Sequence, residues 1–324
     1  MCDSWRLPPP RELTVAEVAE VFGRLGRLDV VRLTGGEPLL RADLPELVEA
    51  VLRRSRPLVV HVTTNGSLPH RAVELVRGCS SPHKLRLMVS FDGLAEVHDR
   101  NRGSPAGFRL ALETVRLLAE LRRTHGFGLS VNHTVISERS LADGPGLQAL
   151  MAKLQVEVHS VLAYADSAIY GIRLQGRSAE HLLSSGGYPL HPDLRAADTA
   201  GFLRRELART GRCSDLLLRW GKRYYLRGLL ARVECAGDRR RSIRPGPPCV
   251  ALRSHLRLLP DGRVPVCQFN SRTVGNLKDQ SWTEVWHGPR AVAARRWVDA
   301  CPGCWAECEV IPSALYSGDI LRGL

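Results

Sequence analysis

Residues 30–38 read Val-Val-Arg-Leu-Thr-Gly-Gly-Glu-Pro, a short run rich in β-branched residues that ends in two glycines, a carboxylate and a proline. A run of this kind predicts a buried strand. Glycines directly after a strand let the backbone approach a ligand closely, and the Glu37 carboxylate can accept a hydrogen bond from an ammonium group. Taken alone, residues 35–38 fit equally well as an ordinary strand-to-helix turn with a surface glutamate.

The strand at 30–33 is the first of five that the sequence predicts. Four further β-branched runs, each typical of a buried parallel strand, lie at residues 58–63, 85–91, 129–135 and 156–162. Helical patterns lie between them: capping boxes at residues 14–17 and 43–46 open apolar stripes, and a longer stripe covers residues 107–123. This alternation predicts an α/β fold, either a barrel or a doubly wound sheet.

Polar residues and glycines gather at the predicted carboxyl ends of these strands. Thr64-Asn65-Gly66 follows the second strand, Asp92-Gly93 follows the third, and Asn132 lies within the fourth. Both barrels and doubly wound sheets place their active sites at this end of the strands. The sequence therefore predicts a functional site there, although no acid and base pair stands out as catalytic.

Three further motifs occur in the order that is typical of a known superfamily. Cys2-Asp-Ser-Trp5 resembles the end of a CxxxCxxC loop, and residues 131–135 resemble a cofactor-facing fifth strand. Ser90-Phe-Asp-Gly93, with the pairs at 98–99 and 102–103, resembles the segment after a fourth barrel strand. Together with residues 35–38, these motifs make the chain from about residue 2 to residue 163 resemble the radical S-adenosylmethionine superfamily.

This resemblance implies a 4Fe-4S cluster with one open iron that binds S-adenosylmethionine, and reductive cleavage of that molecule to a 5′-deoxyadenosyl radical that abstracts a substrate hydrogen. Glu37 and the Gly35-Gly36 backbone would hold the methionine amino end. Ser90 and Asn132 would contact the ribose or the carboxylate. Ser90 could instead bond its own strand backbone, and Asn132 could be an outward-facing strand residue.

The sequence departs from the family pattern at its first residues. Cys2 matches the third cluster cysteine, and its two companions would lie three and seven residues upstream, before Met1. The family barrel has six strands, and five are predicted. We therefore expect a partial (β/α)6 TIM-like barrel without its first strand. With one cluster ligand, we expect no radical chemistry from these residues unless upstream residues are supplied. An internal codon taken as the start would explain the pattern. A truncated, non-catalytic relative would explain it as well.

A second set of cysteines follows at regular spacing. Cys249 and Cys267 flank Gly262, and Cys301 and Cys304 form a CxxC pair. Four such thiolates suit either zinc or an iron–sulfur cluster. The spacing resembles the SPASM/Twitch module, which implies an auxiliary 4Fe-4S cluster. Cys308 is either a further ligand or a free thiol.

Other cysteines and local patterns complete the C-terminal prediction. Cys235 could substitute as a ligand but reads more simply as a loop cysteine. Residues 256–259 and 264–266 predict a β-hairpin around the turn 260–262, and residues 282–286 predict a short helix. The chain then divides into a radical S-adenosylmethionine partial barrel at 1–165, a bridging segment at 166–245 and a SPASM/Twitch domain at 246–324.

The composition limits the classes of binding partner that we expect. The formal net charge is +13, but only four of the 46 basic residues are lysine, which is typical of a coding bias rather than a binding patch. No helix-turn-helix, RNP or zinc-finger spacing accompanies the charge, so nucleic-acid binding is not expected. Apolar runs are too short to cross a membrane, and nine cysteines without a secretory segment indicate the cytoplasm.

The resemblance leaves the substrate open. Most relatives with this module modify peptides or proteins, so we expect a peptide or protein substrate and an electron donor such as flavodoxin or ferredoxin. A small-molecule dehydrogenase is one alternative. A non-catalytic binding protein with only an iron–sulfur or zinc site is another.

Overall fold

The computed structural model describes residues 11–165, 167, 169, 188, 190–210, 216–235, 246–301 and 303–323. The chain divides into two compact units, one spanning 13–162 and one made mainly of 163–324. Cys2 and Cys213 lie outside the described residues. Within the described part, none of the helices combines the length and apolar character that crossing a membrane requires.

The first unit is built on a parallel sheet of five strands in the order β1-β2-β3-β4-β5. The strands are β1 (Val30–Leu33), β2 (Val59–Thr64), β3 (Leu85–Phe91), β4 (Gly128–Val135) and β5 (Glu157–Leu162). All four neighbouring pairs are parallel, so every carboxyl end lies at one edge. The five predicted strands are confirmed, each within one residue of its predicted bounds.

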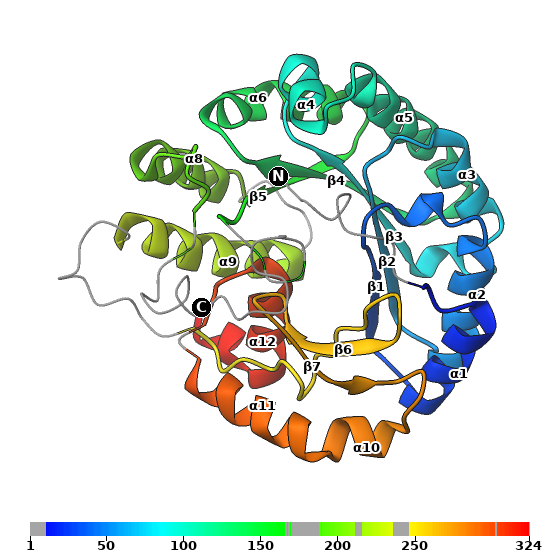
Figure 1. Ribbon diagram of the computed structural model, residues 1–324. Helices are drawn as coiled ribbons and strands as arrows, with labels where there is room; N and C mark the ends of the chain where they lie inside the picture. The colour runs from blue at the N-terminus through cyan, green and yellow to red at the C-terminus, as the bar shows by residue number, and fades with distance from the viewer. Residues whose placement is uncertain are drawn as a thin grey trace. The chain divides into compact units, whose positions relative to one another are not determined.

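Helices lie along one face of this sheet (Figure 1). They are α1 (Val15–Leu25), α2 (Leu44–Ser55), α3 (Pro69–Arg77), α4 (Ala95–Arg102), α5 (Gly107–His125) and α6 (Glu138–Lys153). The residues that alternate toward the helices, such as Val60, Val62, Val89 and Val131, are fully buried. Their neighbours on the other face are more exposed and mostly polar. The unit is an α/β partial barrel whose second face carries polar side chains.

One of the two predicted capping boxes is present. Thr14 accepts from the Glu17 amide, and Glu17 accepts from the Thr14 amide at 2.8 Å, so α1 begins as predicted. The prediction at 43–46 is wrong, because Asp43 makes no side-chain cap. Its carboxylate is instead held by Arg41, whose Nε lies 2.6 Å from Oδ1. The guanidinium also lowers the pKa of Asp43.

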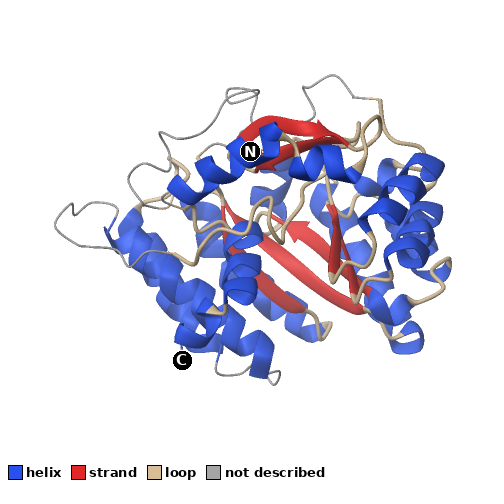
Figure 2. Ribbon diagram, turned by 90° about the horizontal axis from the view of Figure 1, so that it is seen from below, coloured by secondary structure: helices blue, strands red, loops and turns tan. Residues whose placement is uncertain are grey.

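Helices predominate among the described residues of the second unit (Figure 2). They are α8 (Ala196–Arg209), α9 (Leu216–Cys235), α10 (Trp282–His287), α11 (Pro289–Ala300) and α12 (Glu307–Ser317), followed by η6 (Asp319–Gly323). Two antiparallel strands, β6 (Arg263–Cys267) and β7 (Asn270–Asn276), form a ribbon. The described residues of the predicted bridging segment group with this unit, and the three-part division itself stays a prediction.

The prediction of the C-terminal hairpin is wrong about which segments pair. The turn at 260–262 exists, because Gly262 N donates to the Leu259 carbonyl at 2.9 Å. Residues 256–259, however, form no strand, and β6 pairs with β7 through the next turn. The sequence after Cys267 reads Gln-Phe-Asn-Ser, without the glycine that usually marks a tight hairpin turn. The predicted helix at 282–286 is confirmed as α10.

Trp305 fixes the chain directly after Cys304. Its ring stacks on Tyr224 at a centroid distance of 5.6 Å, and the Arg232 guanidinium lies 3.8 Å above it. Its Nε1 donates to the Tyr225 carbonyl at 2.9 Å. The backbone adopts φ 52°, which non-glycine residues rarely do. These contacts with α9 hold the CxxC segment in one conformation.

Candidate functional site

The loop after β1 presents an open backbone edge. Gly35 has φ 147°, a conformation that favours glycine, and Gly36 follows it in an exposed position. A side chain built at either glycine would meet no atom within 4 Å. The two glycines are therefore not required by packing, and the backbone here is accessible to a bound molecule, as the sequence predicts.

The Glu37 carboxylate joins this loop to the end of β2. It accepts hydrogen bonds from Thr64 Oγ1 at 2.7 Å, from the Asn65 amide at 2.6 Å and from the Leu39 amide at 3.1 Å. A carboxylate offers about four acceptor positions, so capacity remains on Oε2 for a further donor. Glu37 thus braces two loops at the carboxyl edge, a task that its sequence motif does not reveal.

Ser90 and Asn132 are neighbours across the sheet. They are register partners in the β3–β4 ladder, and Asn132 is in turn the partner of His159 in β5. All three alternate away from the helix-covered face. The structure therefore joins two predicted site residues into one row and adds His159. Sequence reasoning missed this histidine, since only the register of β5 shows that it continues the row.

Residues of the motif at 90–103 are also held together by hydrogen bonds within the motif and to the start of α5. Arg102 donates through Nε and Nη2 to the two oxygens of the fully buried Asp92, at 2.7 and 2.8 Å. The Asp92 amide donates to His98 Nδ1 at 3.2 Å, and the Phe108 amide donates to Asp99 Oδ1 at 2.7 Å. These contacts fix α4 and the start of α5, so much of the motif serves to hold the end of β3 in place.

Cysteines of the second unit gather around one small core. Cys267, Cys301, Cys304 and Cys308 all pack against Phe269 and Ala306. Together with Cys249 they are cysteines of intermediate exposure that form no disulfide. Phe269 in turn contacts Tyr164 edge-on, at a ring distance of 5.4 Å. Cys308 thus lies with three of the predicted ligands, while Cys235 ends α9.

Burial raises the pKa of three of these thiols and so keeps them protonated when no cation is present. Burial raises the pKa of Cys249 to about 11, and the negative charge of Glu309 adds to this effect. Burial likewise raises the pKa of Cys267 and of Cys304, again with a contribution from Glu309. Thiolates in such a place need a positive partner, and a metal ion or cluster supplies one.

The donor set fits an iron–sulfur cluster in kind. Five soft sulfur donors in one half-buried neighbourhood suit iron–sulfur or zinc better than magnesium or calcium. Among the described residues, however, no three acidic, histidine or cysteine side chains already surround a single metal-sized point. The thiols therefore share a neighbourhood without yet surrounding a common centre.

Two family models match the chain. The model of the radical SAM superfamily matches residues 1–143, and that of an iron–sulfur cluster-binding domain, SPASM, matches residues 249–308. The second match ends on Cys308. The first match covers most of the predicted barrel, and the second covers the predicted auxiliary-cluster cysteines Cys249, Cys267, Cys301 and Cys304.

The chain is also similar to three named enzymes over part of its length. The AdoMet-dependent heme synthase of Methanosarcina barkeri is 33% identical over 42% of this chain and 37% of its own length. Fe-coproporphyrin III synthase of the same organism is 24% identical over 85% of this chain and 70% of its own. Pre-heme d1 synthase of Dinoroseobacter shibae is 25% identical over 88% and 68%. The chain thus spans between about a third and two thirds of these relatives.

Solved structures share the fold. Native anSMEcpe with bound AdoMet superposes with a TM-score of 0.57 at 15% identity, covering 96% of this chain and 87% of that one. Native anSMEcpe with bound AdoMet and Kp18Cys peptide gives 0.55 at 16% identity, covering 87% and 74%. At this identity the likeness establishes the architecture alone.

Proposed function

Because this chain carries a radical SAM domain followed by a SPASM iron–sulfur domain, we propose that it is an enzyme that cleaves S-adenosylmethionine reductively to abstract a hydrogen atom from its substrate. When bound, the 4Fe-4S cluster and S-adenosylmethionine supply a 5′-deoxyadenosyl radical, which is the cofactors' own chemistry. The chain's residues bind, orient and shield these groups. Cys2 would contribute one ligand to the first cluster.

The observation that carries the proposal is the edge of the sheet at the carboxyl ends of its strands. The open backbone at Gly35 and Gly36 would receive the methionine amino end, and Glu37, already fixed by Thr64 and Asn65, would accept from its ammonium group. The row of Ser90, Asn132 and His159 offers hydroxyl, amide and imidazole groups for the ribose and carboxylate.

The second part of the proposal concerns the auxiliary cluster. Four of the five cysteines Cys249, Cys267, Cys301, Cys304 and Cys308 would hold a 4Fe-4S cluster in the second unit. Such a cluster would accept one electron from the substrate radical that is left when the hydrogen atom has been removed. Reduced thiols and iron–sulfur clusters also fit a reducing compartment, and a cytoplasmic location with flavodoxin or ferredoxin as electron donor belongs to this proposal.

For the substrate, a carboxylated tetrapyrrole is the candidate that the relatives support. Fe-coproporphyrin III synthase and pre-heme d1 synthase align with 85% and 88% of the chain, and the names of both refer to tetrapyrroles. The peptide or protein substrate expected from the sequence stays a second prediction. It is supported by the resemblance to enzymes with this C-terminal module, most of which modify peptides or proteins.

A direct test measures 5′-deoxyadenosine. The protein as encoded by its gene, with any in-frame codons upstream of Met1 included, is reconstituted anaerobically, reduced with dithionite and supplied with S-adenosylmethionine. We expect 5′-deoxyadenosine to form, and its complete absence from a protein that holds iron and sulfide would refute the proposal.

A second assay separates the substrate classes. Fe-coproporphyrin III and a mixture of cysteine- and serine-containing peptides are added in parallel, and 5′-deoxyadenosine is compared with a reaction without substrate. Stimulation by the tetrapyrrole, with a product mass change that matches loss of hydrogen or of carboxyl groups, supports the first class. Stimulation by peptides alone would overturn it in favour of the second.

A further inference from the structure

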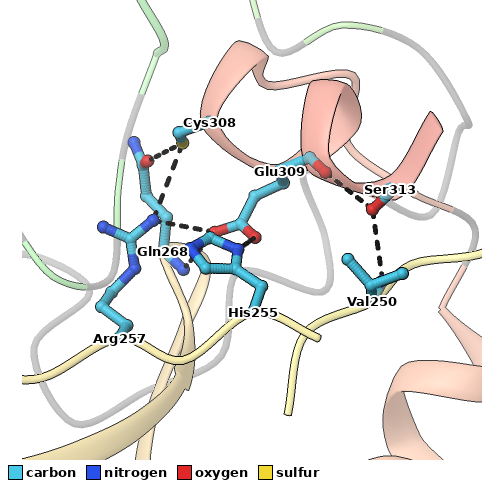
Figure 3. A network of polar contacts seen from close by, with 7 residues as sticks. All are labelled: Val250, His255, Arg257, Gln268, Cys308, Glu309 and Ser313. Carbon is cyan, nitrogen blue, oxygen red and sulfur yellow. Dashed lines mark hydrogen bonds and ion pairs between the residues drawn. The ribbon is translucent and has the colours of Figure 1, made fainter. Parts of the chain in front are cut away.

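A buried polar network lies beside the cysteines of the second unit and joins three segments of the chain (Figure 3). Glu309 lies in the first turn of α12, next to Cys308. His255 and Arg257 belong to the segment before β6, and Gln268 directly follows β6. The Glu309 side chain is only 4% exposed and that of Arg257 only 16%. Charged groups buried to this extent need defined partners.

Glu309 is the centre of the network. Its Oε1 accepts from Arg257 Nη2 at 2.9 Å, and its Oε2 lies 3.1 Å from His255 Nδ1. The backbone amide of Gln268 also donates to Oε1, at 3.4 Å. Two cationic or donor side chains therefore compensate one carboxylate. Arg257 is held in a single position as a result.

The same helix is tied to the first cysteine of the module. Ser313 Oγ donates to the Glu309 carbonyl at 2.6 Å and accepts from the Val250 amide at 3.2 Å. Val250 directly follows Cys249. The network thus couples the position of α12, which carries Cys308, to the residue beside Cys249.

Arg257 also reaches a sulfur atom. Its Nη2, the atom that donates to Glu309, lies 3.7 Å from Cys308 Sγ. Cys308 Sγ in turn donates to Gln268 Oε1 at 2.9 Å. An amide side chain carries both an acceptor and a donor end, so Gln268 can meet this sulfur as a thiol or as a thiolate. Figure 3 shows both side chains directed at Cys308.

We propose that Cys308 is a ligand of the auxiliary cluster and that Arg257, held by Glu309, is a positioning residue that donates an N–H to its sulfur. This inference rests on the proposed function. Hydrogen bonds and positive charge at cluster sulfurs stabilise the reduced, more negative state and so raise the reduction potential. Arg257 therefore sets how readily the auxiliary cluster accepts an electron, while Glu309 and His255 hold the guanidinium in place.

A second arginine of the same segment provides a matched control. Arg253 pairs with Asp299 at 2.8 and 2.9 Å, but both partners are about half exposed. Within the described residues, Arg253 makes no hydrogen bond to a cysteine. Replacing Arg253 with methionine removes the same charge and the same side-chain atoms. An effect specific to Arg257 then arises from its buried contacts.

The experiment compares wild type, Arg257→Met, Arg257→Lys and Arg253→Met as full chains reconstituted anaerobically. Iron, sulfide and zinc are measured, and the midpoint potential is taken from the EPR signal that S-adenosylmethionine leaves unchanged. We expect Arg257→Met to have a more negative potential and to retain less iron, Arg257→Lys to lie between it and wild type, and Arg253→Met to match wild type.

A double variant separates the contact with sulfur from the loss of charge balance. Arg257→Met combined with Glu309→Gln removes both members of the buried pair, which proteins often tolerate well. We expect it to regain cluster content while its potential stays below that of wild type. An unchanged potential in the double variant, or a Cys308→Ala protein with the iron content and potential of wild type, would overturn the inference alone. If neither variant with methionine at position 257 holds a cluster, Arg257→Lys is compared with wild type instead. A midpoint potential of Arg257→Lys equal to that of wild type would then overturn the inference. Zinc without sulfide in wild type would overturn the proposed function as well.

Discussion

At the level of single residues, burial sets the protonation of histidines on the helix side of the sheet. His133 in β4 has no exposed surface, and burial lowers its pKa to about 4, against a weaker opposing effect from the Ser140 backbone. Burial also lowers the pKa of His98, with the charges of Asp92 and Arg102 acting in opposite directions. The folded chain therefore holds these side chains neutral.

Stability should consequently fall in mild acid. Between about pH 6.5 and pH 4 the unfolded chain binds a proton at His133 that the folded chain refuses, so the free energy of unfolding decreases as the pH falls through this window. The shift corresponds to about 3 kcal/mol at most. Urea unfolding at several pH values should show a shallower pH dependence for His133→Leu than for wild type. The exposed His83, replaced by asparagine, serves as the control, and equal slopes in all three proteins would contradict the expectation.

Glu37 allows a test at the candidate cofactor site. In Glu37→Gln the side chain keeps an acceptor for Thr64 and loses the charge that would meet an ammonium group. We expect the affinity for S-adenosylmethionine to fall about tenfold or more, since a charged hydrogen bond contributes about 1.5–3 kcal/mol. Equilibrium dialysis of anaerobic protein measures the affinity, and thermal unfolding measures the fold. Lower thermal stability with an unchanged dissociation constant would reduce Glu37 to a brace between two loops.

The sequence alone singles out Glu37 as a candidate but does not show its partners. Thr64 and Asn65 lie 27 and 28 residues away and meet the carboxylate only because β1 and β2 are paired in one register. His159 shows the same limit. Its strand could be predicted from its composition, but which side chains face the row of Ser90 and Asn132 depends on pairing with β4.

At the level of elements, strand prediction succeeded where the physical signal is local. Each strand is a short β-branched run, and burial against helices on one face selects such residues. Two predictions failed for different reasons. Asp43 binds the Arg41 side chain two residues away instead of the backbone amides of α2. The ribbon of β6 and β7 turns at residues without the expected glycine. Neither outcome is encoded in hydrophobic periodicity.

Helix α9 offers a prediction about the cluster segment. A methyl group at Gly228 would overlap the ring of Trp305, whereas one at Gly221 in the same helix would meet no atom within 4 Å. Gly228→Ala should therefore destabilise the protein by about 1–3 kcal/mol, the usual cost of overpacking, and lower iron retention because Cys304 precedes Trp305. Gly221→Ala should be neutral or slightly stabilising, since alanine favours a helix. Denaturant unfolding and iron analysis test both, and equal behaviour of the two variants would contradict the role of Trp305.

At the level of the whole molecule, the arginine-rich composition has a structural counterpart. Arg102 neutralises the buried Asp92, and Arg257 neutralises the buried Glu309, where a guanidinium can make several directed hydrogen bonds that a lysine cannot. Hydrogen bonds and charges of His255 and Arg257 outweigh the effect of burial and lower the pKa of Glu309 to about 2. Some of the excess charge seen in the sequence thus serves the interior, in each of the two units.

The auxiliary site makes a prediction for the molecule as a whole. Cys301→Ser combined with Cys304→Ser should remove about four irons per chain, since one 4Fe-4S cluster is lost. Metal binding to buried thiols contributes folding free energy, so the second unit should also lose stability. Hydrogen–deuterium exchange should show the loss of protection in peptides from β6 and α12, whose residues surround the thiols. Cys79→Ala is the matched control, because this buried cysteine lies in the first unit, outside the match to the iron–sulfur domain. Stoichiometric zinc in wild type, released by the double substitution without any change in sulfide, would refute a redox cluster and leave a structural metal site.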